Sequence, residues 1–253
     1  MIRRSAKKAY TAFHLVFSLV GPSWAVADFR ALEPGFEIGE IKIQSGIFTS
    51  ELAAVRIDPK FWKFSVYSSA KLTTAAEVCK LTGSFAAINA NFFGKDLLPL
   101  GLIISETKVL HPIQLGGRTL TGIFFKDGGD YKIVFRDKLK LSPEIQEAIQ
   151  AGPRLITDGE IISIPQDSPT RRSAVAIDRK GRVLLFASKD RFPGLTLVEL
   201  QKVLLDKELD IKDALNLDGG GSSQLFVDAK EAERKVNVSG GDRVPVFLTL
   251  FPL

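Results

Sequence analysis

Residues 214–223 read ALNLDGGGSS: a short, mostly apolar run, then an aspartate, three consecutive glycines and two serines. A short run of this kind, bounded by glycines, is typical of a buried β-strand. Three glycines in a row cost about 0.5 to 1 kcal/mol each relative to alanine, so a plain turn rarely contains all three. The stretch therefore predicts a strand that ends at Asp218, followed by backbone that another group approaches closely.

The glycine segment after Asp218 has three interpretations. Its consecutive N–H groups can form a concave nest for a phosphate or for developing negative charge, with Asp218 as nucleophile, base or acceptor for a sugar hydroxyl. It can also be a tight hairpin with an aspartate-type turn. A calcium loop would need several oxygen ligands at alternate positions, and Asp218 is the only charged residue of the segment. We expect no metal site and no cofactor.

Short apolar runs recur on both sides of this stretch and predict many strands. They lie at residues 38–43, 52–57, 61–67, 85–88, 102–104, 120–125, 131–135, 173–178, 183–187, 224–227 and 244–250. The turn at residues 126–130 predicts a hairpin between two of them.

Helices are predicted at three places. Residues 74–77 and 196–199 form capping boxes, and Ser142 followed by proline is a typical helix start, with the end near Gly152. Many strands with three interspersed helices favour an α+β fold. We predict a single domain with a mixed, mostly antiparallel twisted sheet and about three helices.

Residues 1–27 have the features of a signal peptide. Cations within residues 3–8 precede an apolar stretch at 12–20, and small residues at 25 and 27 favour cleavage before Asp28. An uncleaved anchor is the alternative, but the apolar stretch is well short of the roughly 20 residues that span a bilayer. We expect residues 28–253 to be the mature domain, periplasmic or secreted, without stable membrane insertion.

Charge and rare residues exclude several classes of protein. Residues 1–27 hold four cations and no acid, so their removal lowers the formal net charge from +5 to +1, and nucleic acid is not an expected partner. Cys79 is the only cysteine, which excludes an intrachain disulfide. His111 is the only histidine after residue 27, with no nucleophile motif nearby. Any catalysis is expected to use carboxylates.

Arginine and asparagine side chains supply further candidates. Arg171 and Arg172 open the strand predicted at 173–178, and a guanidinium binds phosphate through two parallel hydrogen bonds. Because side chains alternate along a strand, only one of the pair is expected to face a site, and a solvated strand end is the simpler reading. Asn89 and Asn91 follow a predicted strand, where they can bind a ligand or cap a turn.

Four motifs resemble those of the phosphodiester glycosidase family and occur in the family's order. They are INANFF at 88–93, GPRL at 152–155 with Gly159 downstream, RSAV at 172–175 and NLDGGGS at 216–222. The resemblance extends from about residue 52 to the C-terminus. The chain departs from the family pattern where Ala90, Asn91 and Ala176 replace glycines, and asparagine tolerates positive φ.

The resemblance implies an exported hydrolase that cleaves a sugar 1-phosphodiester. It assigns Asp218 to the sugar as nucleophile or base, Arg172 to the phosphate and Asn89 to a sugar hydroxyl. Substrate-binding roles follow for Gly219, Gly220, Gly221, Ser222, Gly152, Arg154 and Asn91. Because phosphate has a second pKa of about 6, it leaves with little protonation, and one carboxylate could suffice.

Two questions stay open at this point. The alternative to a hydrolase is a non-catalytic envelope module that binds phosphorylated glycan or cell-wall polymer at the site around Asp218. A phosphorylated or nucleotide-linked sugar is the expected partner of the hydrolase and of the module. A second carboxylate could come from Asp158, Glu160 or Asp178, and the retaining or inverting outcome depends on its distance from Asp218.

Overall fold

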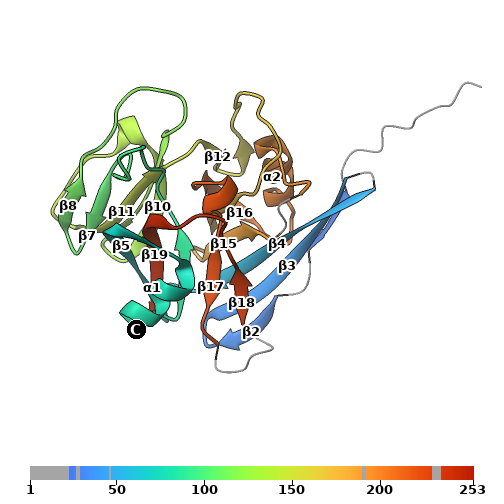
Figure 1. Ribbon diagram of the computed structural model, residues 1–253, viewed down its shortest axis with the longest axis horizontal. Helices are drawn as coiled ribbons and strands as arrows, with labels where there is room; N and C mark the ends of the chain where they lie inside the picture. Colours follow the sequence, from blue (N-terminus) through green and yellow to red (C-terminus); the bar gives the residue numbers. More distant parts are fainter. Residues whose placement is uncertain (1–22, 27–28, 46, 190–191, 230–234) are drawn as a thin grey trace, which may run out of the picture.

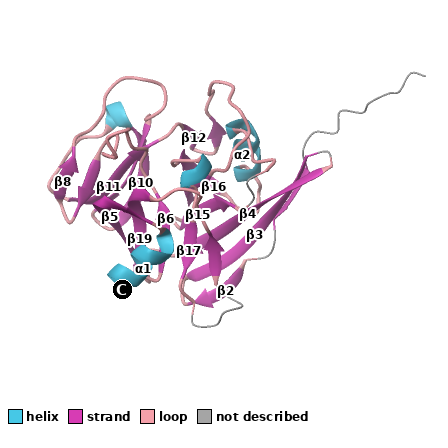
Figure 2. Ribbon diagram, viewed as in Figure 1, coloured by secondary structure: helices cyan, strands magenta, loops and turns pink. Residues whose placement is uncertain are grey.

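The computed structural model describes residues 23–26, 29–45, 47–189, 192–229 and 235–253. Its strands form three sheets, and every pairing between them is antiparallel (Figures 1 and 2). Among the described residues, no helix has the length and apolar character needed to cross a membrane.

The largest sheet has nine strands and carries the stretch that ends at Asp218. Its order is β1-β3-β4-β15-β14-β16-β12-β13, with β2 paired to β3. The strands are β1 (Ser23–Val26), β2 (Arg30–Glu33), β3 (Phe36–Ser45), β4 (Phe48–Ile57), β12 (Arg154–Thr157), β13 (Glu160–Ile161), β14 (Ser173–Asp178), β15 (Val183–Ser188) and β16 (Ile211–Asn216).

Two five-stranded sheets complete the fold. One runs β10-β9-β11-β7-β8 and the other β18-β17-β6-β19-β5. Their strands are β5 (Trp62–Thr73), β6 (Ala86–Asn89), β7 (Ile103–Ser105), β8 (Lys108–His111), β9 (Gly122–Asp127), β10 (Asp130–Phe135), β11 (Ile145–Ala151), β17 (Leu225–Val227), β18 (Val236–Val238) and β19 (Val244–Pro252). The hairpin predicted around residues 126–130 is confirmed, because β9 and β10 pair through it.

Two α-helices lie among the described residues, α1 (Ala75–Thr82) and α2 (Leu197–Leu204). Both predicted capping boxes are confirmed, with Thr74 and Thr196 as the N-caps. Each threonine accepts a hydrogen bond from the backbone of a glutamate three residues later, whose side chain reaches back to the cap. The apolar side of α2 packs on one face of the nine-stranded sheet, where it lies beside β12 and β16 in Figure 1.

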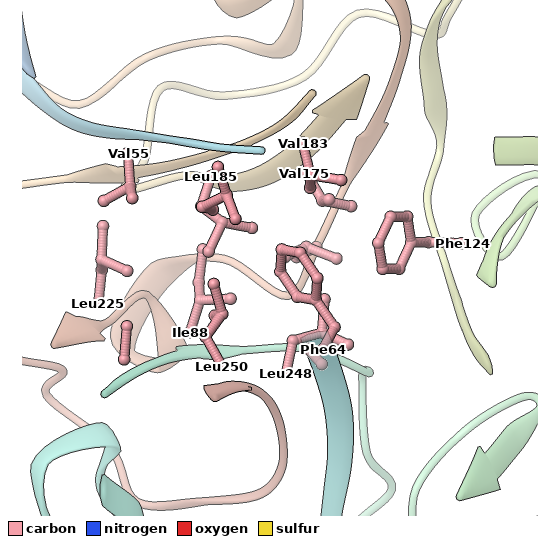
Figure 3. Close-up of a cluster of buried hydrophobic side chains, with 14 of the residues drawn as sticks. Val55, Phe64, Ile88, Phe124, Val175, Val183, Leu185, Leu225, Leu248 and Leu250 are labelled. Carbon is pink, nitrogen blue, oxygen red and sulfur yellow. The ribbon is translucent and has the colours of Figure 1, made fainter. Parts of the chain in front are cut away.

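The largest hydrophobic cluster draws residues from all three sheets. In Figure 3, side chains of the nine-stranded sheet face side chains of the β5–β19 sheet, and Phe124 of the third sheet closes one side. The labelled residues are Val55, Val175, Val183 and Leu185 on the first side, with Phe64, Ile88, Leu225, Leu248 and Leu250 opposite. This shared core fixes the positions of the three sheets relative to one another.

The prediction of an α+β fold with a mixed sheet and three helices is wrong. The protein is mostly β, its sheets are antiparallel, and the helix expected from Ser142 to Gly152 is strand β11. The prediction of that helix rests on its start and stop signals, Ser142 followed by proline and Gly152 followed by proline, which say nothing about pairing with other strands. Pairing with β7 and β9 buries four consecutive residues, 148–151, whereas a surface helix would bury only one stripe.

Most of the predicted signal peptide lies outside the described residues, as does Asp28, the first residue after the expected cleavage site. Residues 23–26 are described and form β1, which pairs with β3 at the edge of the nine-stranded sheet.

Side chains from the neighbouring sheet cover the free edge of β5. The Phe64 N–H donates to the Tyr131 hydroxyl at 2.8 Å, and the Val66 N–H donates to Glu147 Oε2 at 2.7 Å. The Ser105 hydroxyl donates to the Val66 carbonyl at 2.9 Å. Burial raises the pKa of Tyr131 to about 12, so this phenol stays neutral. These bonds satisfy an edge that would otherwise present unpaired backbone groups, and they join two sheets.

We predict that Tyr131→Phe lowers the free energy of unfolding by about 1 to 3 kcal/mol, because it leaves the buried Phe64 N–H without an acceptor. Urea denaturation followed by fluorescence measures the change. Tyr67→Phe is the matched control, since the Tyr67 hydroxyl has no hydrogen-bond partner within the described part of the chain. Equal stability of the two variants would contradict the assigned role of Tyr131.

Candidate active site

Asp218 lies where strands of two different sheets end side by side. Its backbone N–H donates to the Ala90 carbonyl at 3.0 Å, and the preceding Leu217 N–H donates to the Ser173 carbonyl at 2.9 Å. Ala90 directly follows β6, and Ser173 is the first residue of β14. Asp218 is therefore fixed by its backbone at the junction between the nine-stranded sheet and the β5–β19 sheet.

Asn89 holds this junction together. Its Nδ2 donates to the Asp218 carbonyl at 2.7 Å, while its Oδ1 accepts from the Ser173 hydroxyl at 2.7 Å and from the Gln224 N–H at 3.0 Å. The side chain is fully buried. The structure thus brings the predicted site residue Asn89 directly to Asp218, with both ends of its amide engaged by the protein.

The glycine loop, residues 219–222, closes into a short 3-10 turn at Gly220–Ser222. The Gly219 N–H donates to Asp218 Oδ1 at 2.9 Å, and the Gly220 N–H donates to the Arg171 carbonyl at 2.9 Å. Gly220 has φ of 61°, a left-handed conformation that favours glycine. Two of the three glycine amides therefore bind protein acceptors, one of them the Asp218 carboxylate itself.

The carboxyl group of Asp218 has a perturbed acidity. Burial raises its pKa to about 6, against hydrogen bonds from the Ser222 hydroxyl and the Gly219 N–H that lower it, and the negative charge of Asp242 raises it further. A carboxylate that interacts with a second carboxylate in a partly desolvated place is a frequent feature of catalytic sites.

Asp242 is a candidate that the sequence analysis missed. The Gly241 and Asp242 N–H groups both donate to the Gly221 carbonyl, at 2.7 and 2.9 Å. A Cβ at Gly221 would collide with the Asp242 carboxylate, so glycine at 221 permits the close approach of this acid. The available sequence signal was the Gly-Gly-Asp at 240–242, which is too common in turns to suggest a role.

Gln224 braces the same region and was also missed. Its Oε1 accepts from the Ala75 N–H at 2.7 Å, and its Nε2 donates to the carbonyls of Ser222 and Asp242, at 3.4 and 3.3 Å. It is almost fully buried. One side chain thus connects the start of α1 with the glycine loop and the Asp242 segment.

A cavity of about 370 Å³ opens beside the glycine loop, lined by Thr170, Arg171, Gly220, Gly221, Gly241 and Asp242. Arg171 is buried there and donates to the carbonyls of Ser188 and Ser239.

Arg172, the predicted phosphate ligand, donates to the Leu195 carbonyl at 2.8 Å and pairs with Asp167. Burial lowers the pKa of Arg172, and the nearby Asp167 opposes this effect.

The other predicted substrate-binding residues are divided between two places. Asn91 is buried next to Ala90, its Nδ2 faces the carbonyls of Leu100 and Leu102, and its Oδ1 has no partner among the described residues. The Gly152 carbonyl accepts from Asn216 Nδ2 at 2.8 Å, two residues before Asp218. Arg154 lines a different cavity from the one beside the glycine loop.

The three acids that the sequence offered as a second carboxylate, Asp158, Glu160 and Asp178, do not line the cavity beside the glycine loop. Asp178 is buried and binds Arg182 at 2.7 Å together with two turn amides, while Asp158 and Glu160 are exposed around a turn of the nine-stranded sheet. Within the described ranges, no group of three or more His, Cys, Asp or Glu side chains is placed to hold a metal ion.

The fold is similar to that of solved structures. The catalytic domain of zebrafish N-acetylglucosamine-1-phosphodiester alpha-N-acetylglucosaminidase, auto-inhibited by its pro-peptide, matches with a TM-score of 0.67 and 18% identity over 91% of this chain and 88% of that chain. A hypothetical protein from Synechocystis matches with a TM-score of 0.65 and 16% identity over 90% of this chain and 64% of that chain. Identities this low establish similarity of fold alone.

Sequence comparison gives a second line of evidence. The uncharacterized protein YigE of Escherichia coli (strain K12) is 29% identical over 142 residues, which are 53% of this chain. The match covers 54% of YigE, so the chain spans about half the length of that relative. The family model for phosphodiester glycosidases matches residues 82–250, which include Asn89, Arg172, the glycine loop and Asp242. The chain therefore belongs to the phosphodiester glycosidase family.

Proposed function

We propose that this protein is an exported hydrolase that cleaves a sugar 1-phosphodiester, with Asp218 acting at the anomeric carbon. The observation that carries the proposal is the pair of interacting carboxyl groups, Asp218 and Asp242, at a glycine loop that borders a cavity. Family membership supports glycosidase chemistry, and the signal-peptide features of residues 1–27 support export.

The chemistry suits a phosphate leaving group. Cleavage of the bond from the anomeric carbon to oxygen leaves the electron pair on the phosphate oxygen, which carries it without a proton from the enzyme. The Asp218 carboxylate then attacks the anomeric carbon or takes a proton from the attacking water, and water supplies the hydroxyl of the product. Glycine at 221 leaves room for the Asp242 carboxylate to approach the loop that follows Asp218.

Asp242 is the second carboxylate of the proposal. Its segment is held at the Gly221 carbonyl and by Gln224, so the position of this acid is fixed although its side chain is exposed. Glycosidases commonly use a pair of carboxyl groups in different environments. Asp242 therefore takes the place for which Asp158, Glu160 and Asp178 were considered.

We predict that Asp218→Asn lowers turnover of UDP-N-acetylglucosamine or an N-acetylglucosamine 1-phosphodiester by about 100-fold or more, the usual range for loss of a catalytic acid or base. The amide keeps an oxygen for the Gly219 N–H, so the loop should stay folded. Sugar release by the mature chain and the variant measures the effect. Turnover retained by Asp218→Asn would remove this residue from the reaction, and binding without any sugar release by either protein would indicate a glycan-binding module.

The pH dependence should follow the ionisation of Asp218. Because burial raises its pKa to about 6, the group is protonated and inactive as nucleophile or base below that pH. We predict that kcat/KM rises with pH and levels off above about 6, since this ratio reports ionisations of the free enzyme. Initial rates between pH 4 and 8 provide the check. A rate that falls as the pH rises through 6 would instead make Asp218 a general acid.

Asp242→Asn should change both the rate and the pH profile. Removing the Asp242 charge lowers the pKa of Asp218, so the rising part of the profile moves to lower pH while the plateau rate falls. Asp130→Asn is the matched control, because Asp130 is an exposed acid in the β9–β10 hairpin. A profile that moves equally in both variants would indicate an effect of net charge and not of the pair.

A further inference from the structure

A second cavity, of about 550 Å³, is rich in arginine and shares no lining residue with the cavity beside the glycine loop. We call it the arginine cavity; its lining includes Arg118, Phe135, Arg136, Pro153 and Arg154. Within the described chain, the residues that line it include no aspartate or glutamate. Its volume is in the range of small-molecule sites, which are about 300 to 1,000 Å³.

Arg154 is placed in this cavity by the strand that leads to Asp218. Its Cα pairs with that of Leu215, which lies three residues, or about 10 Å of extended chain, before Asp218. Its stem passes over Gly122, where a Cβ would lie 2.7 Å from Arg154 Cγ, so the backbone there leaves room for this side chain.

The Arg154 guanidinium is only partly satisfied by the protein. Nη1 donates to the Thr157 hydroxyl at 2.9 Å, while the buried Nε has no partner among the described residues. Its centre lies 5.0 Å from the centroid of the Phe135 ring, and burial lowers its pKa. A buried guanidinium nitrogen without an acceptor is costly, and an anionic ligand would remove part of that cost.

Arg136 and Arg118 also line the arginine cavity. Arg136 is buried and donates to the carbonyls of Leu120 and Gly117, both at 2.9 Å, which fixes the loop that carries Arg118. Gln150 Nε2 binds the same Leu120 carbonyl at 2.9 Å. Arg118 is exposed and has no ion-pair partner in the described part of the chain. The loop is therefore held in place, and the Arg118 guanidinium that it carries is accessible to a ligand.

The charges around the arginine cavity favour an anion. Three guanidinium groups line the cavity, and two carboxylates lie near them. Asp137 accepts from Arg136 Nε at 3.2 Å and is itself half exposed, and the charge of Asp213 acts on Arg154. Guanidinium groups form their strongest contacts with phosphate oxygens, which accept two parallel N–H bonds. A carboxylate ligand would use fewer of these donors than a phosphate with three free oxygens.

We propose that the arginine cavity binds a phosphate or diphosphate group, at a site separate from the carboxylates of Asp218 and Asp242. The group belongs either to a free diphosphate or to a phosphorylated sugar, and both offer the same oxygens to Arg118 and Arg154. This site goes beyond the proposed reaction, because it needs neither Asp218 nor cleavage of a bond.

Isothermal titration calorimetry with inorganic pyrophosphate at low ionic strength tests the proposal. We expect one saturable site per chain, weakened about tenfold by Arg154→Ala and by Arg118→Ala, since each removes a charged hydrogen bond. Arg118 is exposed, so its variant should fold even where Arg154→Ala does not. Lys80→Ala, an exposed charge on α1, is the control for net charge, and Asp218→Asn should bind as the unchanged protein does.

Titration with glucose 1-phosphate and with glucose distinguishes the source of the group. Tighter binding of pyrophosphate indicates a free diphosphate, tighter binding of the sugar phosphate indicates a phosphorylated sugar, and glucose alone should not bind. The proposal is overturned if neither anion binds, if folded Arg118→Ala and Arg154→Ala bind as tightly as the unchanged protein, or if Lys80→Ala weakens binding equally. Loss of sugar release in Asp218→Asn with pyrophosphate binding intact separates this site from the proposed reaction.

Discussion

The Asn89 amide is the contact on which the candidate site depends. It joins the end of β6 to the end of β16 through the Asp218 carbonyl, and it also holds Ser173 of β14 and the Gln224 backbone. These strands belong to two sheets, so the contact fixes their junction as well as the site. A fully buried amide is effective here because every bond it loses would leave a polar group unpaired.

The same junction explains why the glycines are needed. With Asp218 fixed by its backbone, the chain must turn at once, and Gly220 does so with a φ of 61°. Gly221 leaves space for the Asp242 carboxylate, which a side chain would displace. The glycine run is thus better explained by a sharp turn and by the approach of a second acid than by an open nest of amides, since the Gly219 and Gly220 amides bind protein acceptors.

The two cavities differ in the charged side chains that line them. The cavity beside the glycine loop is lined by one acid, Asp242, and one cation, Arg171, whereas the arginine cavity has three guanidinium groups and no acid among its described lining residues. Arg154 pairs with Leu215 of β16, the strand that leads to Asp218, so this strand pair connects the arginine cavity with the chain segment before the glycine loop.

Patterns among neighbouring residues predicted part of this protein directly. They gave the capping boxes at 74–77 and 196–199, most of the strands, and the motifs of the family. Contacts between residues far apart in the sequence decided the rest. They turned the helix predicted at 142–152 into β11, they engaged Asn89 and Arg172 with the protein, and they brought Asp242 to Gly221. Periodicity within a segment cannot encode these contacts, because burial and register are set by partners far away in the sequence.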